Sequence, residues 1–310
     1  MSKTVPVTVV IPTMNRPGTL ERTLKTYATG DSVPDQIVIV DQTQDEVLRQ
    51  RVQELANQFC TEYHFQLNPS STKARNVGFS YARNEIVVYS DDDIDVYPET
   101  LDKLYEIMEN PQIALIAGLD DNTGVSRTDI GYILGTKSYK KRNIGHVTKS
   151  VLGRYPDQVR GTVDTEWAMG YFFAVRNSLI QKWNIQWDER LISYAYAEDL
   201  DYSYRYCQRA RREGLICILT DQVHVKHMAS REYRIQTKKS TYMYALHRRY
   251  ISDKNHIGNR AAIGWCDFWR VIERTIKKEH PSDLIKAILI ANKMRKNEYR
   301  DLEETIRGVT

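Results

Sequence analysis

The sequence predicts an α/β protein, in which a mostly parallel sheet is flanked by helices and followed by a helical region at the C-terminus. Apolar runs of strand length alternate with helical patterns, and each of these runs ends in polar residues. Strands that alternate with helices are joined by right-handed crossovers, so neighbouring strands run parallel and helices cover both faces. The chain has 310 residues, 41% of them hydrophobic, and can bury one large core of this kind.

The strands of the first hundred residues are β-branched runs with turn residues after them. In order, we expect these strands over residues 5–11, 36–41, 64–67 and 86–90. A helical pattern follows each of the first three. The fourth runs into a series of aspartates, and a further helix is expected to begin near Pro98.

The second half of the chain continues the alternation and then becomes helical. Residues 165–176 are typical of a buried strand with a glycine, Gly170, at a point of close approach. Two more strands are expected over 215–219 and 223–227. Beyond them, apolar residues recur at helical spacing over 242–251, 265–272 and 284–290. We therefore expect an α/β domain over residues 1–231 and a helical region over 232–310.

The segment after the fourth strand predicts a metal site. It contains Asp91, Asp92, Asp93 and Asp95, and between residues 91 and 102 there are six acidic residues and no basic one. Like charges at one strand end oppose folding unless a cation lies among them, and hard oxygen ligands suit Mg²⁺ or Mn²⁺. The alternative is a solvated acidic turn in which one aspartate caps the following helix.

Three polar strand ends are predicted to meet in one crevice. They are residues 12–16, Asp41 and the aspartates 91–93. Ligands of open α/β sheets bind outside the carboxyl ends of the strands. The sequence has no GxGxxG or GxxxxGK[ST] loop, which argues against a dinucleotide fold and a P-loop. A nucleotide held through a metal fits these residues better.

Four ordered motifs resemble those of family 2 glycosyltransferases. They are VVIPTMNR at 9–16, VIVD at 38–41, KARNVG at 73–78 and DDD at 91–93. The resemblance covers roughly residues 5 to 230. It implies a GT-A fold, a nucleotide-sugar donor, dependence on manganese or magnesium, and inversion at the transferred sugar.

For the donor, the resemblance implies a nucleoside pocket at the end of the first strand. Its residues would be Pro12, Thr13, Asn15 and Arg16. Asp41 would accept a hydrogen bond from the base. The chain departs from the family pattern directly after this aspartate, where the family often has Asp-Asp-Gly-Ser and this sequence reads DQTQ. The nucleobase is therefore left open.

The aspartate triplet would be the DXD motif of the family. Asp91 or Asp92 would contact the ribose, and Asp93 would bind the metal that bridges to the diphosphate. Arg75 would contact the donor, since a guanidinium matches phosphate geometry.

The resemblance also implies a catalytic base in the segment YAEDLDY at 196–202. Asp199 is the expected base, with Glu198 beside it. The alternative is that these carboxylates only complement a helix N-terminus. Family members often carry a histidine at this place, which either completes the metal site or contacts the diphosphate, and His227 fits this position better than His224. The two would lie on opposite faces of a strand, so at most one reaches the site.

Composition adds expectations about partners. No apolar stretch reaches the roughly 18 residues that cross a bilayer, so we expect a cytoplasmic protein. Residues 205–249 hold 11 Lys or Arg against 3 Asp or Glu, and residues 127–160 hold 8 against 2. These stretches suit a polyanionic acceptor, a lipid carrier or peripheral contact with an anionic membrane. The C-terminal helices could also form a homo-oligomer. We expect no nucleic-acid partner and four reduced cysteines.

Together these features predict an inverting glycosyltransferase that uses a UDP- or dTDP-sugar. Its acceptor would be a glycan, a polymer or a lipid-linked sugar in polysaccharide or cell-wall assembly. One alternative is a sugar-1-phosphate nucleotidyltransferase, which would normally carry a glycine-rich basic loop after the first strand. The other is a catalytically silent nucleotide- or carbohydrate-binding module, which would lack the metal or base carboxylates.

Overall fold

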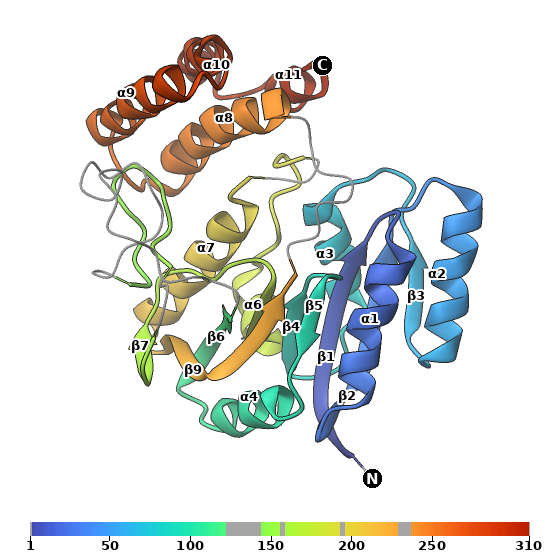
Figure 1. The fold of residues 1–310 in the computed structure, drawn as a ribbon. Helices are drawn as coiled ribbons and strands as arrows, with labels where there is room; N and C mark the ends of the chain where they lie inside the picture. Colours follow the sequence, from blue (N-terminus) through green and yellow to red (C-terminus); the bar gives the residue numbers. More distant parts are fainter. Residues whose placement is uncertain (1, 122–143, 156–158, 193–195, 229–236, 310) are drawn as a thin grey trace.

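The computed structural model confirms the α/β class, with a central sheet flanked by helices and a C-terminal helical region (Figure 1). It describes residues 2–121, 144–155, 159–192, 196–228 and 237–309. Much of the basic stretch 127–160 lies outside these ranges.

The bounds of the elements agree with the predicted order along the chain. The strands are β1 (Lys3–Thr13), β2 (Ser32–Asp41), β3 (Glu62–Phe65), β4 (Ile86–Ser90), β5 (Ile94–Val96), β6 (Ile113–Asp120), β7 (Thr162–Asp164), β8 (Phe172–Arg176) and β9 (Ile216–His227). The helices are α1 (Pro17–Ala28), α2 (Glu46–Gln58), α3 (Ser71–Ser80), α4 (Thr100–Met108), α6 (Asn177–Trp183), α7 (Glu198–Arg212), α8 (Thr237–Asn255), α9 (Arg260–Lys277), α10 (Pro281–Met294), the short 3₁₀ helix η1 (Arg295–Asn297) and α11 (Leu302–Arg307).

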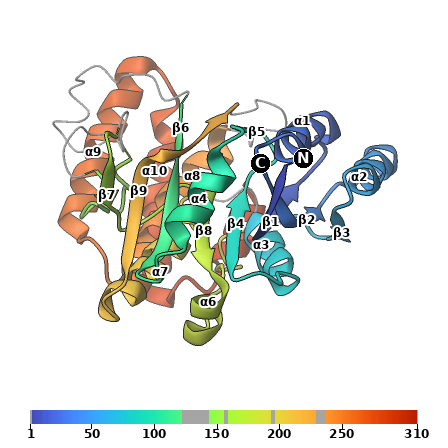
Figure 2. The ribbon, with the colours of Figure 1, turned by 90° about the horizontal axis from the view of Figure 1, so that it is seen from below.

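The sheet is mixed. Its strand order is β3-β2-β1-β4-β8-β6-β9-β5, with β7 paired to β9, and Figure 2 shows the strands side by side. The N-terminal strands β1 to β4 pair in parallel, as the alternation with helices predicts. Strand β8 runs antiparallel to both of its neighbours, β4 and β6. The parallel arrangement therefore holds in the N-terminal half of the sheet, where the first strand ends meet.

Two strand predictions were wrong in detail. The strand expected over 165–176 begins only at Phe172, because the backbone N–H groups of Ala168 and Gly170 donate to side chains of α7 instead of to a neighbouring strand. The two strands expected over 215–227 are one strand, β9, whose register against β6 shifts near its middle. Strand β9 therefore runs without interruption from the core to the site.

The C-terminal helices pack on the α/β part of the chain through α8, which is buried along most of its length. The Arg248 side chain is fully buried, donates to the carbonyl of Ser150 and pairs with Asp267 at 3.1 Å. One hydrophobic core includes residues of both predicted domains. The predicted boundary at residue 231 lies outside the described residues.

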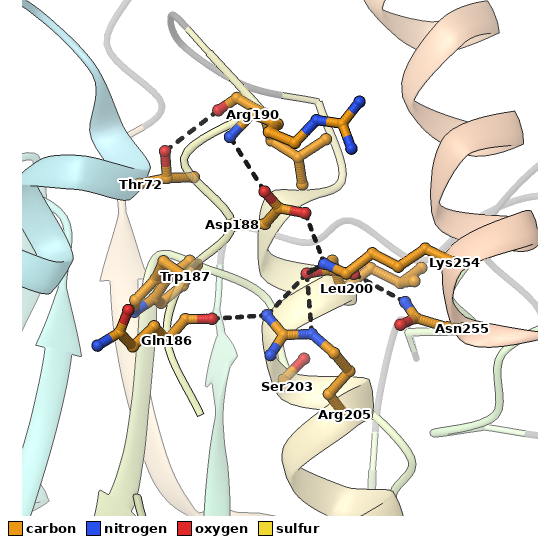
Figure 3. Close-up of polar contacts among 12 residues, drawn as sticks. Thr72, Gln186, Trp187, Asp188, Arg190, Leu200, Ser203, Arg205, Lys254 and Asn255 are labelled. Atoms are coloured by element: carbon orange, nitrogen blue, oxygen red, sulfur yellow. Dashed lines mark hydrogen bonds and ion pairs between the residues drawn. The ribbon is translucent and has the colours of Figure 1, made fainter. Parts of the chain in front are cut away.

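A polar cluster joins α8 to the start of α7 (Figure 3). Asp201 is fully buried, and its carboxylate accepts from Arg205, Lys254 and Asn255. The ammonium of Lys254 also lies 2.6 Å from a carboxylate oxygen of Asp188. Asp201 points away from the cavity described below, as its position two residues after Asp199 predicts.

Replacement of Lys254 by methionine is expected to lower the free energy of unfolding by about 2 kcal/mol, because it removes the cation shared by the fully buried Asp201 and the partly buried Asp188. Urea denaturation measures this change. The matched control is Lys103→Met, which removes an exposed ion pair with Glu106 and should cause no measurable change in stability. Equal stability of the Lys254 variant and wild type would contradict the importance of this cluster.

Candidate active site

A cavity of about 440 Å³ opens at the carboxyl ends of β1 and β4, where the sequence predicted a crevice. Its lining residues come from distant parts of the chain, between Pro12 and His227. Of the predicted site residues, those that line it are Pro12, Thr13, Arg16, Arg75, Asp91, Glu198, Asp199 and His227. The remaining predicted residues are Asn15, Asp41, Asp92 and Asp93, which lie next to these but do not line the cavity.

Asp91, Asp93 and His227 form a cluster that could hold a metal ion. One ligand atom from each lies within 4.8 Å of the other two. The Nε2 atom of His227 is 3.2 Å from a carboxylate oxygen of Asp93, and its ring stacks on that of Tyr171. Two carboxylates and one imidazole suit a divalent cation such as Mn²⁺. The two carboxylates also suit Mg²⁺, which prefers oxygen ligands. The residues present therefore fit the predicted ion.

His227 enters this cluster because β9 continues past its pairing with β6 to pair with β5, beside the aspartates. Burial alone would lower the pKa of His227, but Asp93 and Asp91 outweigh burial and raise it. His224 instead lies against Asp121, with its Nδ1 2.9 Å from a carboxylate oxygen. The expected division of the two histidines between opposite faces is therefore observed.

Asp92 points into the protein and binds the turn that follows β1. Its carboxylate is fully buried and accepts from the Thr13 hydroxyl at 2.6 Å and from Arg16 at 2.5 Å. Burial raises the pKa of Asp92 to about 7, against the opposing effect of Arg16. The geometry does not favour the predicted ribose contact for Asp92, because its side chain does not reach the cavity. Asp91 is the member of that pair that does.

Asp41 is also engaged inside the protein. Its carboxylate accepts from the backbone N–H of Thr43 and from the Tyr63 hydroxyl, and burial raises its pKa. Its contact with a base therefore stays a prediction. Gln42, the residue after Asp41, lines the cavity instead. Asn15 adopts a φ of 57°, which an asparagine tolerates, and its backbone N–H donates to the Thr43 hydroxyl.

Arg75 connects the two sides of the cavity. Its guanidinium donates to Asp91 at 3.0 Å and to Glu198 at 3.2 Å. The ring of Trp187 lies 4.5 Å below the guanidinium carbon, so the cation is held between carboxylates and an aromatic face. Sequence reasoning missed Trp187, because nothing local marks a tryptophan as the support of a residue more than a hundred positions away.

The head of α7 presents Asp199 to the cavity. Ala197 precedes the helix with a φ of 64°, and Asp199 accepts from the N–H of Gly170 at 2.9 Å and of Leu200 at 2.7 Å. Burial raises the pKa of Asp199 against these two hydrogen bonds, and burial together with Asp199 raises the pKa of Glu198 to about 7. A carboxylate with a raised pKa is a stronger base than an ordinary one.

Gly170 allows the close approach that its sequence position predicted. A Cβ atom at this residue would lie 3.2 Å from the Cβ of Asp199 and 3.3 Å from a guanidinium nitrogen of Arg75. Both neighbours belong to the cavity, so even a small displacement reaches the site.

Gly170→Ala is expected to reduce turnover roughly tenfold, because it displaces the side chains of Asp199 and Arg75 together. The control is Gly264→Ala on α9, where an added Cβ meets no atom within 4 Å and activity should not change. Steady-state kinetics on both variants provide the measurement. Unchanged turnover in Gly170→Ala would show that this contact does not position the site.

Residues 8–181, more than half of the chain, match the family described as glycosyl transferase family 2. No curated protein matches the chain.

Solved structures share the fold. The chain aligns with GalNAc-T7 bound to UDP, GalNAc and Mn²⁺ at 17% identity and a TM-score of 0.57, over 89% of this chain and 58% of that one. It aligns with the mannosyltransferase PcManGT from Pyrobaculum calidifontis, in complex with GDP-Man and Mn²⁺, at 14% identity and a TM-score of 0.54. This alignment covers 97% of this chain and 83% of that one. It aligns with residues 1–349 of S. aureus TarS at 17% identity and a TM-score of 0.51, over 99% of this chain and 91% of that one. At these identities the likeness establishes a shared fold.

Proposed function

The chain belongs to glycosyl transferase family 2, and we propose that it transfers a sugar from a nucleotide-diphosphate sugar to an acceptor hydroxyl with inversion. The observation that carries this proposal is the arrangement of the cavity. Asp91 and His227 of the cluster line it together with Asp199, which comes from a different part of the chain, and Asp93 completes the cluster beside the cavity. Inverting transfer needs both a place for the leaving diphosphate and a base for the attacking hydroxyl.

Asp199 acts as the base. In a direct displacement, the acceptor oxygen forms a bond to the anomeric carbon while the bond to the diphosphate oxygen breaks, and the hydroxyl proton passes to Asp199. The N–H groups of Gly170 and Leu200 orient its carboxylate. Glu198 is tied to Arg75, which leaves Asp199 as the better-placed acceptor of the proton.

The donor diphosphate lies beside the cluster of Asp91, Asp93 and His227. A divalent cation held there, Mn²⁺ or Mg²⁺, supplies positive charge to the departing diphosphate. Two of the structural neighbours hold a nucleotide or nucleotide-sugar together with Mn²⁺, which supports the proposal. Arg75 adds a second positive charge on the same side of the cavity and contacts the donor.

The nucleoside occupies the pocket at the end of β1. Pro12, Thr13 and Arg16 line it, with Asn15 in the same turn. The buried pair of Arg16 with Asp92 keeps this turn in place. A UDP- or dTDP-sugar is the proposed donor, and Gln42 is the side chain at the cavity with an amide able to read a base edge.

The proposed acceptor is a glycan or a lipid-linked sugar in polysaccharide or cell-wall assembly. A panel of nucleotide-sugars with Mn²⁺ or EDTA tests the donor side first, by release of nucleoside diphosphate. Metal-dependent release from one donor supports transfer. Pyrophosphate release from a nucleoside triphosphate and a sugar 1-phosphate would instead identify the nucleotidyltransferase. Binding without any turnover would identify the silent module.

A further inference from the structure

Helix α9 carries its apolar side outward. Trp265, Phe268 and Ile276 are 53%, 56% and 76% exposed, and their spacing places them on one face of the helix. Trp269 and Ile272 lie on the same face and are partly buried. The rings of Trp265, Phe268 and Trp269 contact one another. A helix of a globular domain normally turns such a stripe toward the core.

The inner side of α9 is occupied by polar contacts. Asp267 is buried there between Arg248 and Arg249 of α8, and Cys266 lies 3.5 Å from the Tyr244 hydroxyl. These contacts determine which side of the helix faces α8. The apolar stripe therefore points away from α8 because of the way the helix packs.

Helix α10, the neighbour of α9, adds exposed apolar residues with lysines next to them. Ile285 and Leu289 are 44% and 64% exposed, and Lys286 and Lys293 are exposed on the same side of the helix. Figure 1 shows α9 and α10 as the outermost helices of the C-terminal region. We call the exposed side chains of these two helices the outer face.

The outer face is basic as well as apolar. Residues 260–294 contain seven Lys or Arg and four Asp or Glu, and one of the four, Asp267, is neutralised inside by arginines of α8. Tryptophan and phenylalanine beside lysines are typical of helices that lie in a membrane interface. No described helix is long and apolar enough to span a membrane, so contact through this face would be interfacial.

We propose that the outer face of α9 and α10 docks on an anionic phospholipid surface. Its apolar side chains would enter the interface, and its lysines would attract the lipid headgroups. Charge complementarity favours this occupant over a second copy of the chain, because a symmetric contact through this face would bring lysines of both copies together. The proposal does not depend on the chemistry of the cavity.

Vesicle co-sedimentation of the full chain tests this proposal. The chain is expected to bind vesicles of phosphatidylcholine with phosphatidylglycerol more tightly than phosphatidylcholine alone, and high salt should weaken the difference. The double variant Phe268→Ser with Ile276→Ser should lose roughly tenfold or more in partitioning. Lys286→Gln with Lys293→Gln should remove much of the preference for the anionic lipid.

Val47→Ser on α2 controls for the loss of an exposed apolar side chain at another place, since Val47 is 77% exposed and Ile276 is 76% exposed. It should bind vesicles like wild type. Circular dichroism and thermal unfolding verify that each variant is folded. The proposal would be overturned if wild type did not bind vesicles. It would also be overturned if Val47→Ser and the double variant lost vesicle binding equally. Sedimentation velocity showing a dimer that only the double variant loses, without vesicle binding, would assign the face to a second copy.

Discussion

Asp199→Asn is expected to lower turnover by roughly 100-fold or more while nucleotide binding is retained. An asparagine has the same shape, and its amide oxygen can still accept from the N–H of Gly170 or Leu200. It cannot accept the proton of the acceptor hydroxyl. Steady-state transfer kinetics and calorimetric nucleotide binding, measured on the same preparation, separate these two properties.

Asp283→Asn serves as the control, because Asp283 is also a carboxylate in the first turn of a helix, α10, far along the chain from the cavity residues. If the loss arose only from removing an acidic residue near a helix N-terminus, both variants would behave alike. Full activity of Asp199→Asn would remove the proposed base.

Asp93→Ala is expected to weaken metal-dependent nucleotide binding by at least about 10–100-fold. It removes one of two carboxylates from the cluster with Asp91 and His227. Binding measured in EDTA should change much less. Calorimetric titration of the nucleotide with Mn²⁺ and with EDTA gives both values.

The acidic run offers its own control for this experiment. Asp95 is two residues away but pairs with Arg22, outside the cluster. Asp95→Ala should therefore retain metal-dependent binding. Equal loss in both variants would mean that general negative charge, and not the geometry of the cluster, attracts the ion.

The features predicted well from the sequence are those in which local pattern and chemistry coincide. The apolar run of β1 must be buried on both faces of a parallel sheet, and the acidic run after β4 has no local cation to balance it. The glutamate and aspartate at the head of α7 belong to a contiguous motif that resembles the one in the family. These signals need no knowledge of distant contacts.

The features that sequence reasoning missed depend on contacts between distant residues. Residues 168–170 leave the sheet because their N–H groups bind α7 side chains some thirty positions away. Asp92 faces inward because Arg16, 76 positions earlier, pairs with it. The helical pattern of α9 predicts an apolar stripe, but only the arginines of α8 determine that this stripe points outward.

The central claim is that the cavity binds a nucleotide through a metal. Calorimetric titration of the full chain with UDP, dTDP, GDP and CDP, each with Mn²⁺ and with EDTA, tests it most directly. The account predicts tight binding of UDP or dTDP that requires the metal. Binding of no nucleotide, or binding that is the same in EDTA, would contradict it.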